Sequence, residues 1–480
     1  MFSQIAAIGL YFSVLVLIGV LSRKKNATDK DFNLGNRQLN FWVTAISAHA
    51  DDMSSWLFIA YPMAIFVSGG EKVWIAIGLI LGMYASWSVI SKRLRRLTED
   101  YDSYTLATFF ERRFRDRSGV IRLLSAAVIL FFMTYYVSAG LVATGRLFDA
   151  LFQIDYYTGI TIATLIMVSY MYVGGFVSVA WTDFAQGMFL LLALVIVPVI
   201  AFLNIDQIGT LFTSAQSRGI SLSILPEWSF SAIFSIFSLT VGWGLGYFGQ
   251  PHILTKFMAI KEVDDLKKSK YLGMAWQITV LAAASAVAYL GFALFPSGLE
   301  KPEMIFVEMA KSVFSPFAVV LTVCGIFAAN LSTMDSQILV CATTLSEDFY
   351  KRILNKNASS KEVLWASRLG ILLFAALAFF LAWGQSKTIM KIVEYAWSGL
   401  GGSFGPLLLT ALYAKEVNSY GAIAGIAVGG TTAAIWPTLN PLITEIQIVP
   451  LFPAFLLSLS AIFAVSRLTR RRVLKIIKTS

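Results

Sequence analysis

The chain has 480 residues, of which 57% are hydrophobic and 14% are charged, and its mean hydropathy is +0.71. Soluble domains carry about 25% charged residues, so this composition excludes a soluble globular protein and indicates an all-α polytopic membrane protein. The net charge is +10, but the basic residues fall in short loops between apolar runs, which indicates membrane orientation rather than nucleic-acid binding.

Apolar runs of roughly 20 residues recur along the chain and predict about thirteen transmembrane helices. The expected limits are 4–22, 40–67, 73–91, 120–149, 155–173, 184–204, 228–249, 270–296, 304–346, 364–384, 389–413, 418–438 and 447–466. The run 304–346 is too long for one crossing, so we expect an outer amphipathic segment before its spanning helix. Basic residues follow the first run instead of preceding it, so we expect a retained span and not a cleaved signal peptide.

Lysine and arginine are distributed unevenly between the two sides of these spans. Loops on one side, together with the tail 467–480, hold roughly five times as many as loops on the other. The positive-inside rule then predicts a cell (inner) membrane protein with its N-terminus outside and its C-terminus cytoplasmic. The basic, amphipathic tail is expected to bind anionic lipid.

The second predicted span contains a polar centre. The run Ser47-Ala48-His49-Ala50-Asp51-Asp52-Met53-Ser54-Ser55-Trp56 places two carboxylates and a histidine inside an apolar segment. Ionisable groups are costly in hydrocarbon and usually mark an ion or substrate path, and an interrupted helix frees carbonyls that bind cations. A short polar hinge at the membrane surface is the alternative.

A second interruption is predicted five spans later, in Gly242-Trp243-Gly244-Leu245-Gly246-Tyr247-Phe248-Gly249-Gln250-Pro251. Interruptions at matching places in two halves indicate a transporter site between inverted repeats, whereas glycines alone also serve close helix packing. The cluster Gly399 to Pro406 is expected to bend a further helix. The predicted organisation is an N-terminal extra helix and loop (1–39), a first repeat (40–204), an outer loop (205–227), a second repeat (228–413), two additional helices (414–466) and the basic tail (467–480).

The ninth span carries a polar face. Ala329, Ser332, Thr333 and Ser336 follow the spacing of one helix face, with Asn330 and Asp335 beside them. Hydroxyl and carbonyl oxygens suit a hard cation, although Ser and Thr on membrane helices also bond to the preceding turn. Asp335 favours the ion site. Asp183, at the predicted inner mouth of the sixth span, is equally compatible with an ion ligand and with a helix N-terminal charge.

Aromatic residues lie near the proposed cavity. Tyr135, Tyr136, Trp243 and Tyr247 offer flat apolar walls with one polar group each, which suits a small solute with an apolar body and charged ends. A membrane-interface belt is the alternative. We find no P-loop, nucleophile elbow or metalloprotease helix, and two cysteines with two histidines give no metal spacing. The chain is therefore not expected to be an enzyme, and an ion gradient remains as the driving force.

These residues resemble the sodium/solute symporter family, and most closely its sodium/proline symporters. The resemblance runs from about Tyr11 to Phe463. It is carried by Leu34-Gly35-Asn36-Arg37, Asp52-Met53-Ser54, Trp74-Ile75-Ala76-Ile77-Gly78, Gly174-Gly175-Phe176 with Trp181-Thr182-Asp183, the glycine-rich run 242–252 and Glu347-Asp348-Phe349-Tyr350.

The resemblance implies a LeuT-type fold of inverted five-helix repeats with sodium as the coupling ion. It implies sodium ligands from the backbone oxygens of Ala50, Met53 and Ala329 and the hydroxyls of Ser332 and Thr333. It assigns coupling to Asp52 and Arg37, and proline binding to Tyr136, Trp243, Tyr247 and Pro251, with Ser54 also part of the site. A possible second sodium would use Asp183, Asp335 and Ser336, together with Ser332.

The chain departs from the family pattern at His49, Asp51, Ser55 and Asp335, and the sequence gives no firm role to His49 or Asp51. The resulting hypothesis is a sodium-coupled symporter that imports L-proline by alternating access through the lipid bilayer. The alternatives are a sodium symporter for another amino acid, a carboxylate or a vitamin, and, less favoured, a transporter-like sensor or an ion channel. The oligomeric state does not follow from the sequence.

Overall fold

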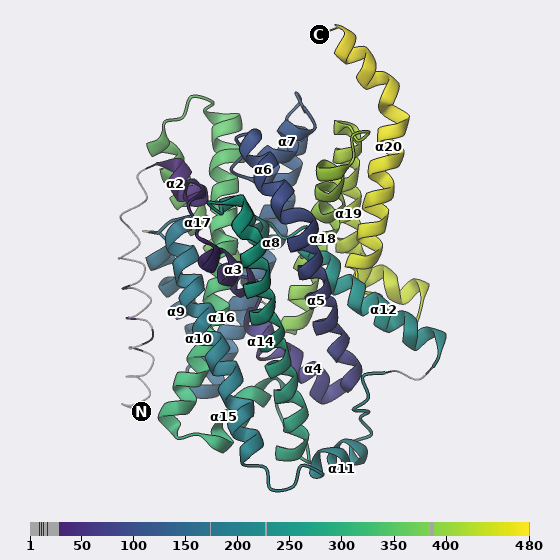
Figure 1. Cartoon of the computed structure of the whole chain (residues 1–480). Helices are drawn as coiled ribbons and strands as arrows, with labels where there is room; N and C mark the ends of the chain where they lie inside the picture. The colour runs from purple at the N-terminus through teal and green to yellow at the C-terminus, as the bar shows by residue number, and fades with distance from the viewer. Residues whose placement is uncertain are drawn as a thin grey trace.

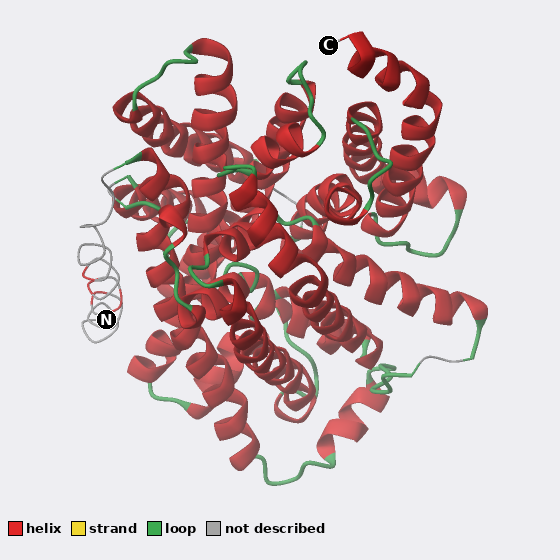
Figure 2. Cartoon of the chain, turned by 45° about the horizontal axis from the view of Figure 1, so that its top comes forward, coloured by secondary structure: helices red, strands yellow, loops and turns green. Residues whose placement is uncertain are grey.

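The computed structural model describes residues 28–172, 174–225, 228–384 and 388–479, together with Gly9, Tyr11, Ser13 and Leu17. In this part of the chain nearly every ordered segment is helical, and the β contact recorded is an isolated bridge between Leu39 and Ile260 (Figure 2). The all-α prediction is confirmed. The predicted first span, 4–22, lies almost wholly outside the described residues.

The first half of the described chain contains these helices: α2 (Asp29–Leu34), α3 (Phe41–Ala50), η3 (Ser55–Leu57), α4 (Ala60–Ser68), α5 (Val73–Ala85), η5 (Ser86–Ser91), α6 (Lys92–Asp100), α7 (Leu106–Arg113), α8 (Val120–Phe152), α9 (Tyr156–Met171), α10 (Phe176–Leu203) and α11 (Thr210–Ser217). The second half contains α12 (Phe230–Gly244), η6 (Leu245–Phe248), α13 (Pro251–Ala259), α14 (Leu266–Leu294), α15 (Ile305–Val313), α16 (Pro316–Thr343), η9 (Thr344–Leu354), α17 (Ser360–Trp383), α18 (Ile389–Tyr413), α19 (Ser419–Ile443) and α20 (Leu451–Thr479). Figure 1 shows them as one bundle.

Nine helices among the described residues are long and apolar enough to cross a membrane, and two shorter apolar ones span 55–68 and 156–169. The chain is therefore a multi-pass membrane protein, but the count of thirteen spans is not confirmed. Two elements share the run 304–346, the short α15 and the spanning α16. The prediction ended the seventh span at 249, whereas the chain continues as α13 to Ala259.

Two helices are interrupted. Regular α-helix ends at Ala50 and restarts at Ala60. The Ala50 carbonyl lacks its usual helical partner, because the Ser54 amide donates to the Asp52 carbonyl instead. In the second half, α12 ends at Gly244, one 3₁₀ turn follows, and Pro251 begins α13, where its missing N–H leaves no helical bond broken. Both interruptions fall where the sequence predicts them.

Glycines bring helix backbones into direct contact. A Cβ on Gly82 of α5 would lie 2.1 Å from the carbonyl oxygen of Gly244 in α12, so neither residue tolerates a larger side chain without movement. The predicted bend at 399–406 is not an interruption, because α18 stays helical throughout. A Cβ on Gly399 would meet the Phe132 ring at 2.2 Å, so this cluster serves close packing.

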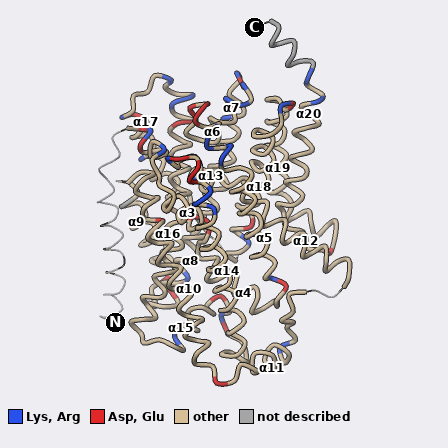
Figure 3. The backbone as a smooth tube through the Cα atoms, in the orientation of Figure 1, with Lys and Arg blue, Asp and Glu red and all other residues tan. Residues whose placement is uncertain are grey.

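The two interruptions are buried inside the bundle, whereas the first part of α12 extends outward at its side (Figure 1). The half-helix α3 packs on α10 and α14, α16 packs on α8 and α10, and α19 and α20 lie beside α18 at one flank (Figure 1). Lysine and arginine gather at the end where α6, α7 and the C-terminus lie (Figure 3). We call this end of the molecule the basic end.

Candidate functional site

Four oxygens predicted to bind sodium meet between the first interrupted helix and α16. The Ser332 Oγ lies 3.3 Å from the Ala50 carbonyl oxygen and 3.0 Å from that of Ala329. The Thr333 Oγ1 lies 3.5 Å from the Ala50 oxygen and 3.1 Å from the Ala329 oxygen. All four residues are buried.

This spacing suits a hard cation. Oxygens at about 2.4 Å from an ion, the distance typical of calcium, lie roughly 3.4 Å apart in an octahedral shell. The separations of 3.0–3.5 Å between these oxygens therefore need little change on binding. Met53, the fifth predicted ligand, is buried in the same interruption, and its amide donates to His49, 3.3 Å away.

Asp52 joins the two interrupted helices. Its carboxylate accepts a hydrogen bond from the Tyr247 hydroxyl in η6, and Tyr247 in turn accepts from the Gln277 amide at 3.0 Å. The Asp52 backbone carbonyl accepts from the Trp56 indole at 2.9 Å. Asp52 thus connects both interruptions, and none of its recorded partners belongs to the four-oxygen cluster predicted to bind sodium.

Buried aromatic rings surround this connection. The Trp243 ring lies 6.2 Å from both the Trp56 and Trp397 rings, and the Tyr247 ring meets Trp397 edge-on at 5.2 Å. The Trp397 indole donates to the Trp243 carbonyl at 3.1 Å, which fixes α18 against the end of α12. Because these rings lie inside the bundle and not on its surface, the interface-belt alternative does not apply to them.

The other predicted substrate residues are also buried. Tyr136 of α8 is buried, its ring is 5.9 Å from His252, and its hydroxyl has no hydrogen-bond partner among the described residues. Pro251 begins α13, and Ser54 lies in the first interruption. A buried hydroxyl without a partner is unfavourable, so the Tyr136 oxygen is suited to a polar group of a bound solute.

The predicted second ion site already contains a cation. The Lys256 ammonium lies 2.8 Å from Asp183 and 3.1 Å from the Ser336 hydroxyl, while Asp335 is buried on the same helix as Ser336. Lys256 falls between the predicted spans 228–249 and 270–296, so the sequence predicts it in a loop on the basic side; this is wrong, because the lysine is buried in α13. Asp183 follows seven residues of α10, so its helix N-terminal interpretation is also wrong.

His49 and Asp51 now have structural partners. The His49 Nε2 accepts a hydrogen bond from the Trp87 indole at 3.0 Å and lies against Gly273, where a Cβ would be only 2.3 Å away. The Asp51 carboxylate lies 3.2 Å from the Lys256 ammonium. His49 therefore packs α3 against neighbouring helices, whereas Asp51 belongs to the buried charge cluster.

Arg37 holds together the segments at the basic end. Its guanidinium donates to the carbonyls of Met258, Thr98 and Ser103 at 2.8–2.9 Å, and burial lowers the pKa of Arg37. The preceding Gly35 has a φ of +59°, and a Cβ there would lie 2.6 Å from Val177, so the turn requires glycine. Arg37 thereby joins the start of α3 to the end of α13.

Replacing Arg37 by lysine is expected to lower the apparent Tm by about 1–3 °C, because one ammonium cannot reach three carbonyls and a buried acceptor left unpaired costs about 1–3 kcal/mol. Cys324 and Cys341 are buried and free, so their reaction with a maleimide dye reports thermal unfolding. The exposed Arg96→Lys on α6 is the matched control. Equal Tm values for the two variants would contradict this role of Arg37.

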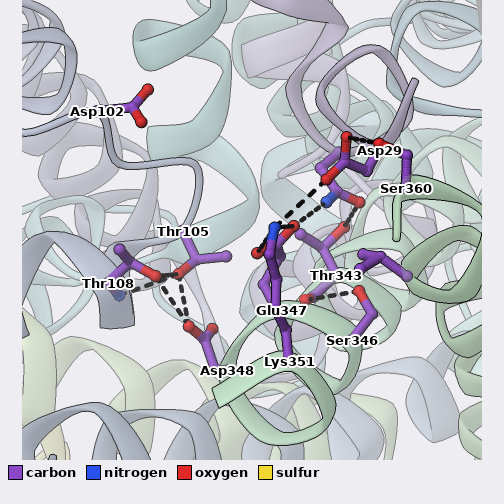
Figure 4. Close-up of polar contacts among 12 residues, drawn as sticks. Asp29, Asp102, Thr105, Thr108, Thr343, Ser346, Glu347, Asp348, Lys351 and Ser360 are labelled. Carbon is purple, nitrogen blue, oxygen red and sulfur yellow. Dashed lines mark hydrogen bonds and ion pairs between the residues drawn. The ribbon is translucent and has the colours of Figure 1, made fainter. Parts of the chain in front are cut away.

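A cavity lies between these sites and the basic end. Its lining includes Pro251, Thr255, Ser336, Phe176 and Asn33. A polar network surrounds it: Asn33 donates to Glu347 at 3.0 Å, and Lys351 bridges Glu347 and Asp29 (Figure 4). Burial opposes ionisation of Asp29, but bonds from Ser360 and Lys351 outweigh it and lower its pKa.

The second part of this network involves Asp348. Its carboxylate accepts from Thr105 and Thr108 of α7 at 3.0 Å and forms an ion pair with Arg122 at 2.6 Å (Figure 4 for the threonines). These bonds join α7 and α8 to η9 around the cavity.

The sequence analysis missed several residues of the site: Trp56, Gln277, Trp397 and, as a buried group, Lys256. Trp397 lies two residues before the glycine-rich stretch that begins at Gly399. This position was the one local feature of the sequence that could have identified Trp397 as a site residue. Lys256 lies five residues after the proline that restarts its helix.

Residues 32–429 match the family described as the sodium:solute symporter family. The high-affinity proline transporter PutP of Bacillus subtilis (strain 168) is 39% identical over 462 residues, which cover 95% of this chain and 96% of that protein. The sodium/proline symporter of Staphylococcus aureus is 37% identical over 475 residues, with 97% and 92% covered.

Solved structures share the arrangement of helices. The substrate-bound, outward-open structure of a Na⁺-coupled sialic acid symporter has a TM-score of 0.80 at 18% identity, and 98% of each chain is covered. MhsT in complex with L-phenylalanine has a TM-score of 0.55 at 13% identity, with 88% of this chain and 97% of that chain covered. The predicted LeuT-type transporter fold is confirmed.

Proposed function

The chain belongs to the sodium:solute symporter family, and on this premise we propose that it imports L-proline together with sodium by alternating access. The observation that carries the proposal is the meeting of four oxygens, from Ala50, Ala329, Ser332 and Thr333, between an interrupted helix and α16. Relatives whose names specify proline support the choice of substrate.

Sodium binding stabilises the first interruption. The Ala50 carbonyl ends α3 and lacks its helical partner, so a cation held between it and α16 fixes the direction in which the chain leaves the helix. That direction positions Asp52 and Trp56, which face the solute site. Sodium therefore binds first and shapes the site for the solute.

Proline fits the chemistry of the aromatic cavity. Its ring packs against Trp243 and Tyr247, and its charged carboxylate and amine find partners at the backbone groups freed by the two interruptions and at the Tyr136 hydroxyl. Pro251 and Ser54 lie at the second and first interruption, where they shape the ends of the site. Asp52 and Arg37 act on the coupling between the halves.

The cavity at the basic end provides the exit. By the positive-inside rule the basic end faces the cytoplasm, so solute and sodium leave past Pro251 and Thr255 once the repeats have moved. The membrane potential adds about 2.3 kcal/mol per charge per 100 mV, which corresponds to roughly fiftyfold accumulation of solute per sodium.

The purified protein in liposomes is expected to take up labelled L-proline at least tenfold faster with an inward sodium gradient than with an equal potassium gradient. Excess unlabelled proline should inhibit this uptake, and collapsing the membrane potential should slow it. Sodium-stimulated uptake of another amino acid, a carboxylate or a vitamin, without inhibition by proline, would overturn the substrate assignment. Solute binding without uptake would indicate a sensor instead.

A further inference from the structure

Lys256 lies at the centre of a buried cluster formed by four segments. Its ammonium is 2.8 Å from an oxygen of Asp183 on α10, 3.2 Å from Asp51 in the first interruption and 3.1 Å from the Ser336 hydroxyl on α16. The lysine side chain is 1% exposed and both carboxylates are fully buried. The Ser336 hydroxyl also lies 3.2 Å from the same Asp183 oxygen.

The ammonium contacts three oxygens in this cluster. It donates hydrogen bonds to Asp183 and Ser336 and forms an ion pair with Asp51, and the Phe176 ring lies 5.1 Å away. Two carboxylates and a hydroxyl form a donor set that would also suit a hard metal cation. The position is thus built for a positive charge, and the chain supplies that charge itself.

We propose that Lys256 is a tethered cation that occupies the place at which Asp51, Asp183 and Ser336 would otherwise hold a second sodium. Resting on the proposed function, this means that the transporter couples one sodium to each solute. Lys256 is a positioning residue, because its recorded contacts do not include the four oxygens of the sodium site. It acts on that site through Asp51, which directly follows Ala50.

The cluster also connects the parts that must move relative to one another. Asp51 belongs to the first interrupted helix and Lys256 to the second, while Asp183 and Ser336 anchor both to α10 and α16. A free ion at this place would dissociate in each cycle, whereas a lysine stays attached to α13.

The number of sodium ions provides the test. In the wild type, ²²Na⁺ binding to the purified protein and the reversal potential of proline flux in liposomes should both give one sodium per protein or per proline. Lys256→Ser leaves both carboxylates without their cation and opens space beside them. Binding should rise to two sodium ions, and the Hill coefficient for sodium should rise from about 1 to about 2.

Two further variants separate this role from simple loss of folding. Lys256→Arg keeps a cation in place and should retain one sodium, whereas Lys256→Ser combined with Asp183→Asn removes the second binding charge and should return the number to one. Two sodium ions in the wild type, or one in a folded Lys256→Ser protein, would overturn the proposal. The ²²Na⁺ count needs no solute, so it remains decisive even if the chain transports something other than proline.

Discussion

Replacing Thr333 by valine is expected to raise the sodium concentration for half-maximal uptake by about 10- to 150-fold. Valine keeps the shape of the side chain but removes the hydroxyl that lies 3.5 Å from the Ala50 oxygen and 3.1 Å from the Ala329 oxygen. An interaction between a hydroxyl and a charged partner is worth about 1.5–3 kcal/mol, which corresponds to this range of affinity. Initial rates of proline uptake over a sodium series give the value directly.

The same helix offers a matched control. The Thr322 hydroxyl also bonds back to its own helix, to Ala318 at 2.6 Å, and its side chain is half-buried away from the interruption. Thr322→Val makes the same chemical change and should leave sodium dependence unaltered. If Thr333→Val and Thr322→Val behave alike, the Thr333 hydroxyl serves only its own helix and the sodium site is wrongly placed.

The interruptions and the polar face of α16 could be predicted because their signals are local. Glycine, proline and adjacent carboxylates inside apolar runs mark both interruptions within a few residues. The helical spacing of Ala329, Ser332 and Thr333 places their oxygens on one face without knowledge of the partner helix. The LeuT-type repeat then sets which interruption this face meets.

The charge cluster could not be predicted, because its members are far apart in the sequence. Lys256 and Asp183 are separated by 73 residues, and no sequence pattern near either residue predicts that they form an ion pair. The same holds for His49 and Trp87, which are 38 residues apart. Lys256 was assigned to a loop because the seventh span was predicted to end at 249, whereas α13 continues to Ala259.

Replacing Asp52 by asparagine is expected to raise the sodium concentration for half-maximal uptake by at least about tenfold while leaving the apparent Tm unchanged. Asparagine keeps the shape and one acceptor oxygen but loses the charge that the Tyr247 hydroxyl bonds to, and bonds to charged groups are the stronger ones. The weakened connection leaves the first interruption less ordered before sodium binds. Asp264→Asn is the control, because that carboxylate is exposed and paired with Lys92 at the surface.

A double-mutant cycle with Tyr247→Phe determines how Asp52 acts. If the carboxylate works by holding the second interruption through Tyr247, Asp52→Asn weakens the bond that Tyr247→Phe removes, and the double variant should be little worse than the more severe single variant. If it works by attracting sodium directly, the two effects on sodium dependence should instead add. We expect the first result, because Asp52 bonds to Tyr247 and Tyr247 is held by Gln277, so sodium at Ala50 and solute at Trp243 share one chain of contacts. Additive effects would make the bond incidental and leave only the charge of Asp52 to explain coupling.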